Sequence, residues 1–139
     1  MTKSCVSRLL KNRRGDGLVE YALIYLLFFT VFYGVIEFGR TVASFNILAG
    51  ATREAGRYAM VHGGASGNLA DEAKLLSVVR QWALVLDPSA ITVTATWTPV
   101  SAPAGGTVLV QSQYRLTPFS GIFGGVLTLR SSSQMVISR

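Results

Sequence analysis

A carboxylate at the entrance to a long apolar stretch is the feature of this sequence that points most directly to chemistry. Glu20 immediately precedes an uncharged run over residues 21–36. A carboxylate costs on the order of 2.5–3.5 kcal/mol at the centre of a membrane helix, and less near the interface. The helix dipole offsets part of this cost in the first turn. Two interpretations stay open: Glu20 has a functional cationic partner, or it snorkels to the lipid headgroups.

The segment that contains Glu20 predicts a membrane-spanning helix. Residues 18–38 would extend about 32 Å as an α-helix, and the hydrocarbon core of a bilayer is about 30 Å thick. Residues 1–15 contain five basic residues and no acidic one. Such an asymmetry places the N-terminus in the cytoplasm and the rest of the chain across the membrane, in the periplasm of a Gram-negative bacterium.

The basic character of the chain is confined to this leader. The protein has 139 residues and a formal charge of +6, with 13 basic and seven acidic residues. The chain after residue 15 therefore has eight basic and seven acidic residues. This excludes a nucleic-acid-binding protein, which carries its basic residues on a folded face.

A basic leader followed by an apolar run has two ordinary explanations. A secretory signal peptide would be cut near Thr41-Val42-Ala43, but the apolar run is longer than usual, and Glu37 and Arg40 precede that site. An uncleaved signal anchor is the other explanation, and the composition leaves it open.

The residues around Glu20 read Arg13-Arg14-Gly15-Asp16-Gly17-Leu18-Val19-Glu20-Tyr21. They resemble the processing site of prepilin-type proteins, in which a basic leader ends in Gly and Glu is the fifth mature residue. Tyr21 in sixth place resembles the second residue of the Glu-Tyr or Glu-Phe pair of the Flp/Tad subgroup. The stretches 35–40 and 51–59 are similar to the TadE-like family, as is the β-rich C-terminal part, residues 108–116 and 127–137.

This resemblance implies a minor pilin or pseudopilin of the Tad (tight adherence) type IV pilus system, needed for pilus assembly and adhesion. A prepilin peptidase would cut after Gly15, so that Asp16 becomes the N-terminus. The implied partners are this peptidase, other pilins and minor pilins, the Tad assembly platform and inner-membrane lipid. The implied location is the bacterial inner membrane, with later incorporation into an extracellular pilus. Two features depart from the pattern: Gly17 is a competing glycine, and Asp16 stands where many relatives carry Phe.

Physical chemistry accounts for this pattern. Glycine lets an extended backbone enter a protease cleft without a side chain in the way. The cut leaves the apolar helix on the mature protein and creates an α-amino group with a pKa of about 7.7–8.0. In a filament this amine can pair with Glu20 of a neighbouring subunit. Since removing one partner of a buried pair costs about 3–5 kcal/mol, the pair would set the register between subunits.

Beyond the membrane segment, the sequence predicts an α+β head in a pilin-like fold. No proline precedes Pro88, so the first helix is expected to continue to Val61 and to end at His62-Gly63-Gly64, with a glycine in the left-handed C-cap. Its buried stripe is predicted at Phe38, Val42, Phe45, Ala49, Thr52, Gly56 and Ala59. Small residues at 50, 51, 55, 56 and 59 would serve either helix packing or contact with the chain's own sheet.

The remainder predicts a second helix and a sheet. Asn68 is the expected N-cap, followed by a stripe of Leu69, Ala73, Leu76, Val79, Ala83 and Leu86. Alternation over 91–97 and 108–114, and a run over 126–138, predict a three- to four-stranded antiparallel sheet. The expected organisation is a leader (1–15), a long helix (16–62, transmembrane about 18–38) and a periplasmic head (63–139). Ile122, Phe123 and Val126 could form an exposed apolar tip that touches a partner or the membrane surface, or they could fill the head's own core.

No constellation of catalytic residues is present. His62 has no Cys or carboxylate at ligand spacing and is expected to be a helix-end residue. Cys5 lies in the leader, and the serines at 131–133 have no nearby base. We expect no enzymatic activity, no cofactor and no metal. The alternative to a filament subunit is a single-pass anchor that presents a periplasmic interaction domain and stays in the membrane.

Overall fold

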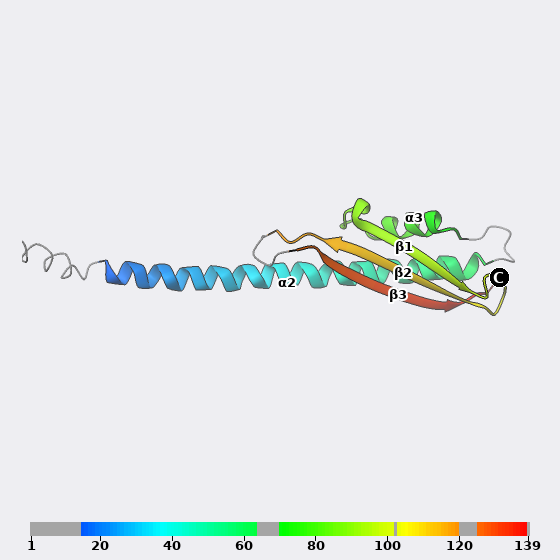
Figure 1. Ribbon diagram of the computed structural model, residues 1–139, viewed down its shortest axis with the longest axis horizontal. Helices are drawn as coiled ribbons and strands as arrows, with labels where there is room; N and C mark the ends of the chain where they lie inside the picture. Colours follow the sequence, from blue (N-terminus) through cyan, green and yellow to red (C-terminus); the bar gives the residue numbers. More distant parts are fainter. Residues whose placement is uncertain (1–14, 64–69, 102, 120–124, 139) are drawn as a thin grey trace, which may run out of the picture. The chain divides into compact units, whose positions relative to one another are not determined.

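The computed structural model describes residues 15–63, 70–101, 103–119 and 125–138. The chain divides into two compact units, Met1–Phe38 and Gly39–Arg139. The described elements are, in chain order, α2 (Asp16–Val61), α3 (Glu72–Trp82), the 3-10 turn η2 (Pro88–Ala90), β1 (Ile91–Thr98), β2 (Thr107–Leu116) and β3 (Leu127–Val136). Figure 1 labels the two α-helices and the strands. A long apolar helix, a second helix and an antiparallel sheet confirm the predicted α+β class with a pilin-like layout.

Helix α2 ends where the sequence predicts, but by a different cap. Its last residue is Val61, and the backbone N–H of His62 donates to the carbonyls of Tyr58 and Ala59. The predicted left-handed glycine is wrong at Gly63, because the described glycines with positive φ are Gly105 and Gly125; Gly64 lies outside the described residues. A hydrogen bond from the N–H of Ser138 to the Met60 carbonyl, 3.0 Å long, satisfies one of the last carbonyls instead.

The sheet follows the predicted alternation. Its order is β1-β2-β3, and both pairs are antiparallel. Ile91 lies opposite Tyr114, and Leu116 lies opposite Leu127. The inner face carries the apolar residues of β1 and β2, whereas the outer face carries mainly Thr, Gln, Ser and Arg. One buried and one solvated face is the usual arrangement of an antiparallel sheet.

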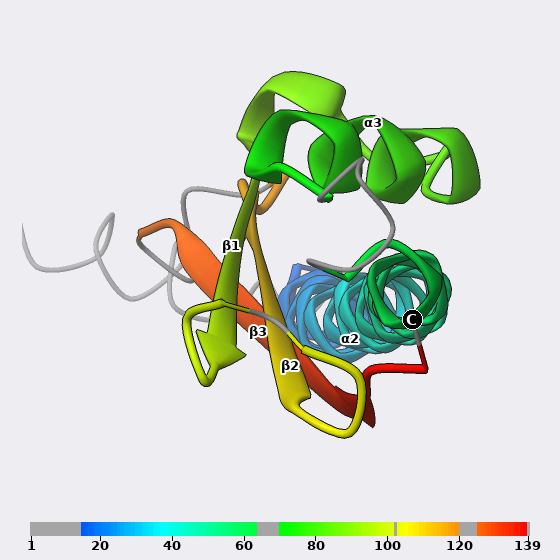
Figure 2. The same ribbon diagram turned by 90° about the vertical axis from the view of Figure 1, so that its right-hand side faces the viewer.

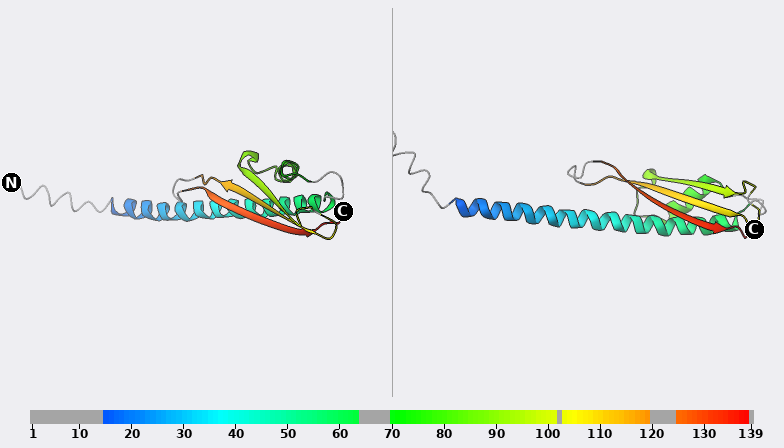
Figure 3. Two further views of the ribbon diagram at one scale, coloured as in Figure 1. Left: turned by 45° about the vertical axis from the view of Figure 1, so that its right-hand side comes forward. Right: turned by 60° about the horizontal axis from the view of Figure 1, so that its bottom comes forward.

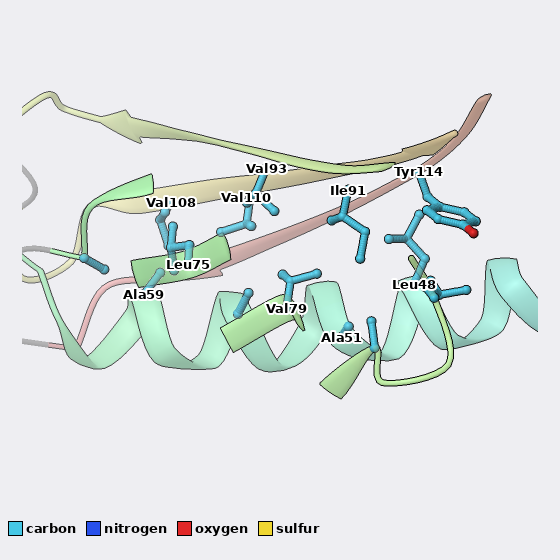
Figure 4. Close-up of a cluster of buried hydrophobic side chains, with 14 of the residues drawn as sticks. Leu48, Ala51, Ala59, Leu75, Val79, Ile91, Val93, Val108, Val110 and Tyr114 are labelled. Atoms are coloured by element: carbon cyan, nitrogen blue, oxygen red, sulfur yellow. The ribbon is translucent and has the colours of Figure 1, made fainter. Parts of the chain in front are cut away.

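The core of the second unit lies between the inner face of the sheet and two helices, α2 and α3, which cover that same face (Figure 2). Figure 4 shows the buried side chains that meet there, among them Leu48 and Ala51 of α2, Leu75 of α3 and Val110 of β2. Both views in Figure 3 show β2 and β3 running alongside the C-terminal half of α2.

The face of α2 that is buried differs from the predicted stripe. Phe38, Val42 and Phe45 are 71%, 42% and 43% exposed, so the prediction is wrong for these three. The buried positions of this half are Ser44, Leu48, Ala51, Thr52, Ala55, Gly56 and Ala59. The small residues Ala51, Ala55, Gly56 and Ala59 thus pack within the chain's own head, whereas Gly50 is exposed. Apolar residues lie on every side of α2, so spacing alone could not select the face.

Helix α3 is shorter than predicted and is capped by another residue. The N-cap is Asp71, whose carboxylate accepts a hydrogen bond from the backbone N–H of Glu72, 2.8 Å long. The predicted cap, Asn68, lies outside the described residues, as does Leu69. Leu75 and Val79 are the buried residues of the helix, and the predicted Leu76 is only partly buried. Ala83 and Leu86 are buried as expected but follow the end of the helix.

Candidate processing and assembly site

The residues singled out by the sequence lie at the very start of α2. Gly15 is an exposed turn residue, Asp16 is the first helical residue, and the N–H of Val19 donates to the Gly15 carbonyl at 3.2 Å. The Gly15–Asp16 peptide bond therefore joins the helix to what precedes it. A Cβ atom on Gly15 or Gly17 would have nothing within 4 Å. Arg13 and Arg14, the predicted leader charges, lie outside the described residues.

Glu20 and Tyr21 follow one turn later. Both are exposed, Tyr21 to 64%. Within the described residues, no ion pair or hydrogen bond involves the Glu20 carboxylate. The backbones of residues 16 and 20 are four positions apart in the helix, or about 6 Å along its axis. An α-amino group at residue 16 would thus lie near the Glu20 carboxylate, which has no partner among the described residues.

The helix beyond Glu20 is apolar on all sides. Large hydrophobic side chains from Leu18 to Phe32 are more than half exposed, and they occupy successive positions such as Leu26, Leu27, Phe28 and Phe29. The hydroxyl of Thr30 donates to the Leu26 carbonyl at 2.7 Å, so this polar group is satisfied within the helix. The helix is long and apolar enough to cross a membrane, and none of its most apolar window is buried. Only lipid or other apolar helices would cover such a surface favourably.

An exposed apolar helix that could span a membrane, followed by a small head built on an antiparallel sheet, defines an α+β protein with the layout of a pilin. Residues 15–57 match the model of a family described as TadE-like protein. The match confirms the resemblance to TadE-like proteins of Tad pilus systems and indicates a pilus-associated protein of a structural kind that interacts with pilus components. No curated protein and no solved structure matches this chain.

The family match covers the four described residues of the predicted site. Gly15 directly precedes α2, and Asp16, Glu20 and Tyr21 lie within its first two turns, so local sequence is enough to bring the four residues together. His62, by contrast, is a helix-end residue as predicted. Its Nδ1 is 2.9 Å from the Tyr58 carbonyl, and its ring stacks on the Tyr58 ring with centroids 4.0 Å apart. In residues 15–63, 70–101, 103–119 and 125–138, no three His, Cys, Asp or Glu side chains lie together as metal ligands would.

Sequence reasoning missed the role of Arg40. Its guanidinium Nη1 donates to the carbonyl of Thr117 at 3.2 Å and lies over the ring of Phe119, 4.1 Å from the centroid. Arg40 and Thr117 are 77 positions apart along the chain. A basic residue just after an apolar run is a common pattern, and nothing in the sequence indicates that Arg40 would hold the segment after β2.

Proposed function

We propose that this chain is a minor pilin or pseudopilin of a Tad-type type IV pilus, processed after Gly15 and required for pilus assembly and adhesion. The observation that carries the proposal is the family match over residues 15–57, which begins at the expected cut and includes Glu20 as the fifth residue after it. Residues 1–15 would be the leader, 16–62 the helix of the mature protein, and 63–139 the periplasmic part of the head.

Cutting at Gly15 separates this proposal from its alternatives. The peptidase accepts a backbone without a side chain at the cut, so Gly15→Leu should abolish the loss of residues 1–15. Gly17→Leu is the matched control, because both positions are exposed to open space and neither substitution meets a steric obstacle within the described chain. The intact mass of the protein isolated from membranes shows whether residues 1–15 have been removed. Processing that is equally impaired in both variants, or a mature N-terminus beyond Arg40, would contradict the proposal.

Glu20 would act after processing, by pairing with the new amino group of Asp16 in a neighbouring subunit. An unpaired carboxylate between apolar helices is costly, and loss of one partner of a buried pair typically costs about 3–5 kcal/mol. Glu20→Gln should therefore leave insertion and processing intact but reduce recovery of the subunit in sheared pili. Glu54→Gln is the matched control, since Glu54 pairs with Arg57 three residues away on the same helix. Normal piliation by the Glu20 variant would refute the register role.

The partners proposed here are the prepilin peptidase, other pilins and minor pilins, the Tad assembly platform and inner-membrane lipid. The mature protein would cross the inner membrane once, with its N-terminus in the cytoplasm and its head in the periplasm, and then enter the pilus. The alternative is an anchored interaction domain that remains in the membrane. Co-purification of the detergent-solubilised mature chain with other pilins supports the filament subunit, whereas a processed chain found only in membranes supports the anchor.

A further inference from the structure

We propose that the β2–β3 end of the head is a membrane-contact surface, seated on the headgroups of the bilayer that α2 crosses. This surface consists of Arg40, Arg115, Phe119, Val126 and Leu127. The inference rests on the proposed membrane insertion of α2 and adds a second, peripheral contact with lipid. Ile122 and Phe123, for which the sequence also suggested an apolar tip, lie outside the described residues.

The second unit has two distinct ends along α2. At one end Arg40 binds Thr117, which follows β2. At the other end the Met60 carbonyl accepts hydrogen bonds from the backbone N–H and the hydroxyl of Ser138, which follows β3. From residue 40 to residue 60, the helix rises about 30 Å. The strands therefore run along this half of α2, and the β2–β3 end lies at the level of Arg40.

Arg40 follows the apolar run closely. It is two residues after Phe38, or about 3 Å along a helix axis. When residues 18–38 fill the hydrocarbon core, Arg40 is at the level of the headgroups, which extend about 5–7 Å beyond the core on each side. Its contacts with the Thr117 carbonyl and the Phe119 ring hold the segment after β2 at that same level.

The side chains at this end suit an interfacial position. Phe119, Val126 and Leu127 are 76%, 57% and 46% exposed, although all three are large and apolar. Arg115 is also exposed and pairs in register with Thr128, next to Leu127. Of the acidic residues of the unit, Glu54 lies on α2, and Asp71 and Glu72 lie at the start of α3. Asp87 precedes η2 at the same end of the sheet, because β1 begins there with Ile91 opposite Tyr114. Apolar side chains flanked by arginines favour a surface with anionic lipids.

Depth-dependent fluorescence quenching tests this contact on the full chain in nanodiscs. The variants Phe119→Cys and Val126→Cys are made in a Cys5→Ser background. The single cysteine of each variant is labelled with an environment-sensitive dye. Quenching lipids carry a doxyl group at the top of the acyl chain. Val100→Cys is the matched control: it is an apolar residue, 88% exposed, in the β1–β2 connection at the opposite end of the strands. Phe28→Cys, 58% exposed in the apolar helix, reports insertion itself.

We expect loss of fluorescence at positions 28, 119 and 126, and none at position 100. The loss at 119 and 126 should be larger in discs that contain phosphatidylglycerol than in discs of phosphatidylcholine alone. If the dye at position 28 is quenched but the dyes at positions 119 and 126 are quenched no more than the dye at position 100, the proposed contact of the head is overturned. The membrane insertion of α2 then still stands. Absence of quenching at 28 overturns both. Equal quenching in the two kinds of disc overturns the part assigned to the arginines.

Discussion

The contact between α2 and β3 can be tested at Gly56, where an added side chain would meet residues of β3. A Cβ atom added to Gly56 would lie 2.9 Å from the Ser133 Oγ and 3.5 Å from the Met135 Cε. The first distance is too short for a carbon, so the side chain of Ser133 or the helix itself must move. Gly50 lies in the same helix, is exposed, and would have nothing within 4 Å of an added Cβ.

These two sites predict opposite effects of the same substitution. Replacing an unstrained glycine in a helix by alanine stabilises a protein by about 0.4–1 kcal/mol, which is the whole effect expected for Gly50→Ala. Gly56→Ala gains the same amount, but overpacking of a core costs about 1–3 kcal/mol. The free energy of unfolding should therefore be about 1–3 kcal/mol lower for Gly56→Ala than for Gly50→Ala. Gly56→Val, with two further methyl groups, should be less stable still.

Urea unfolding of the full chain in detergent micelles measures this difference. Trp82 is 60% exposed, so a Trp82→Phe background leaves Trp97, which packs against the core, as the reporter. Ser133→Ala removes the closest oxygen and should restore most of the stability lost in Gly56→Ala, which a double-mutant cycle detects as coupling. If both alanine variants are stabilised equally, β3 does not contact α2 at Gly56, and the reasoning is refuted.

Three further predictions concern the head. Leu48→Ala removes a side chain with 0% exposure and should lower the free energy of unfolding by about 2–5 kcal/mol, whereas Val42→Ala, at a position that is 42% exposed, should have a much smaller effect. The Ser112 hydroxyl is buried without a hydrogen-bond partner in the described chain, so Ser112→Ala should raise stability by about 1 kcal/mol. The Ser89 hydroxyl and then its backbone N–H lower the pKa of Asp87, so Ser89→Ala should raise that pKa in an NMR titration.

Each of these predictions has a clear contrary result. Equal losses in the Leu48 and Val42 variants would place the core elsewhere, and destabilisation by Ser112→Ala would reveal a partner for its hydroxyl. The lowered pKa of Asp87 makes its contribution to stability present above the ordinary pKa of aspartate and lost as the pH falls through the folded value. An unchanged titration in Ser89→Ala would show that the hydroxyl bond, 2.7 Å long, is not formed in solution.

The candidate site was predictable because its residues are neighbours in the chain. Gly15, Asp16, Glu20 and Tyr21 lie within seven successive positions around one helix start, so local helix geometry alone fixes how far apart they are. The second helix was less predictable. Asn and Asp are both favourable N-cap residues, so sequence alone does not choose between Asn68 and Asp71. The helix that begins after Asp71 buries Leu75 and Val79 in the core. Such a choice depends on residues that a local pattern does not contain.

Local properties of the chain were enough to predict the length of α2, its end at Val61 and the strands of the sheet. An uncharged run without proline favours a continuous helix, and alternation of apolar and polar residues favours a half-buried strand. Tertiary packing alone decided which face of α2 is buried and that Arg40 binds Thr117. Hydrophobic burial has no direction of its own, and several faces of α2 are apolar. Only docking of the distant strands selects Leu48 and Ala51 over Phe45.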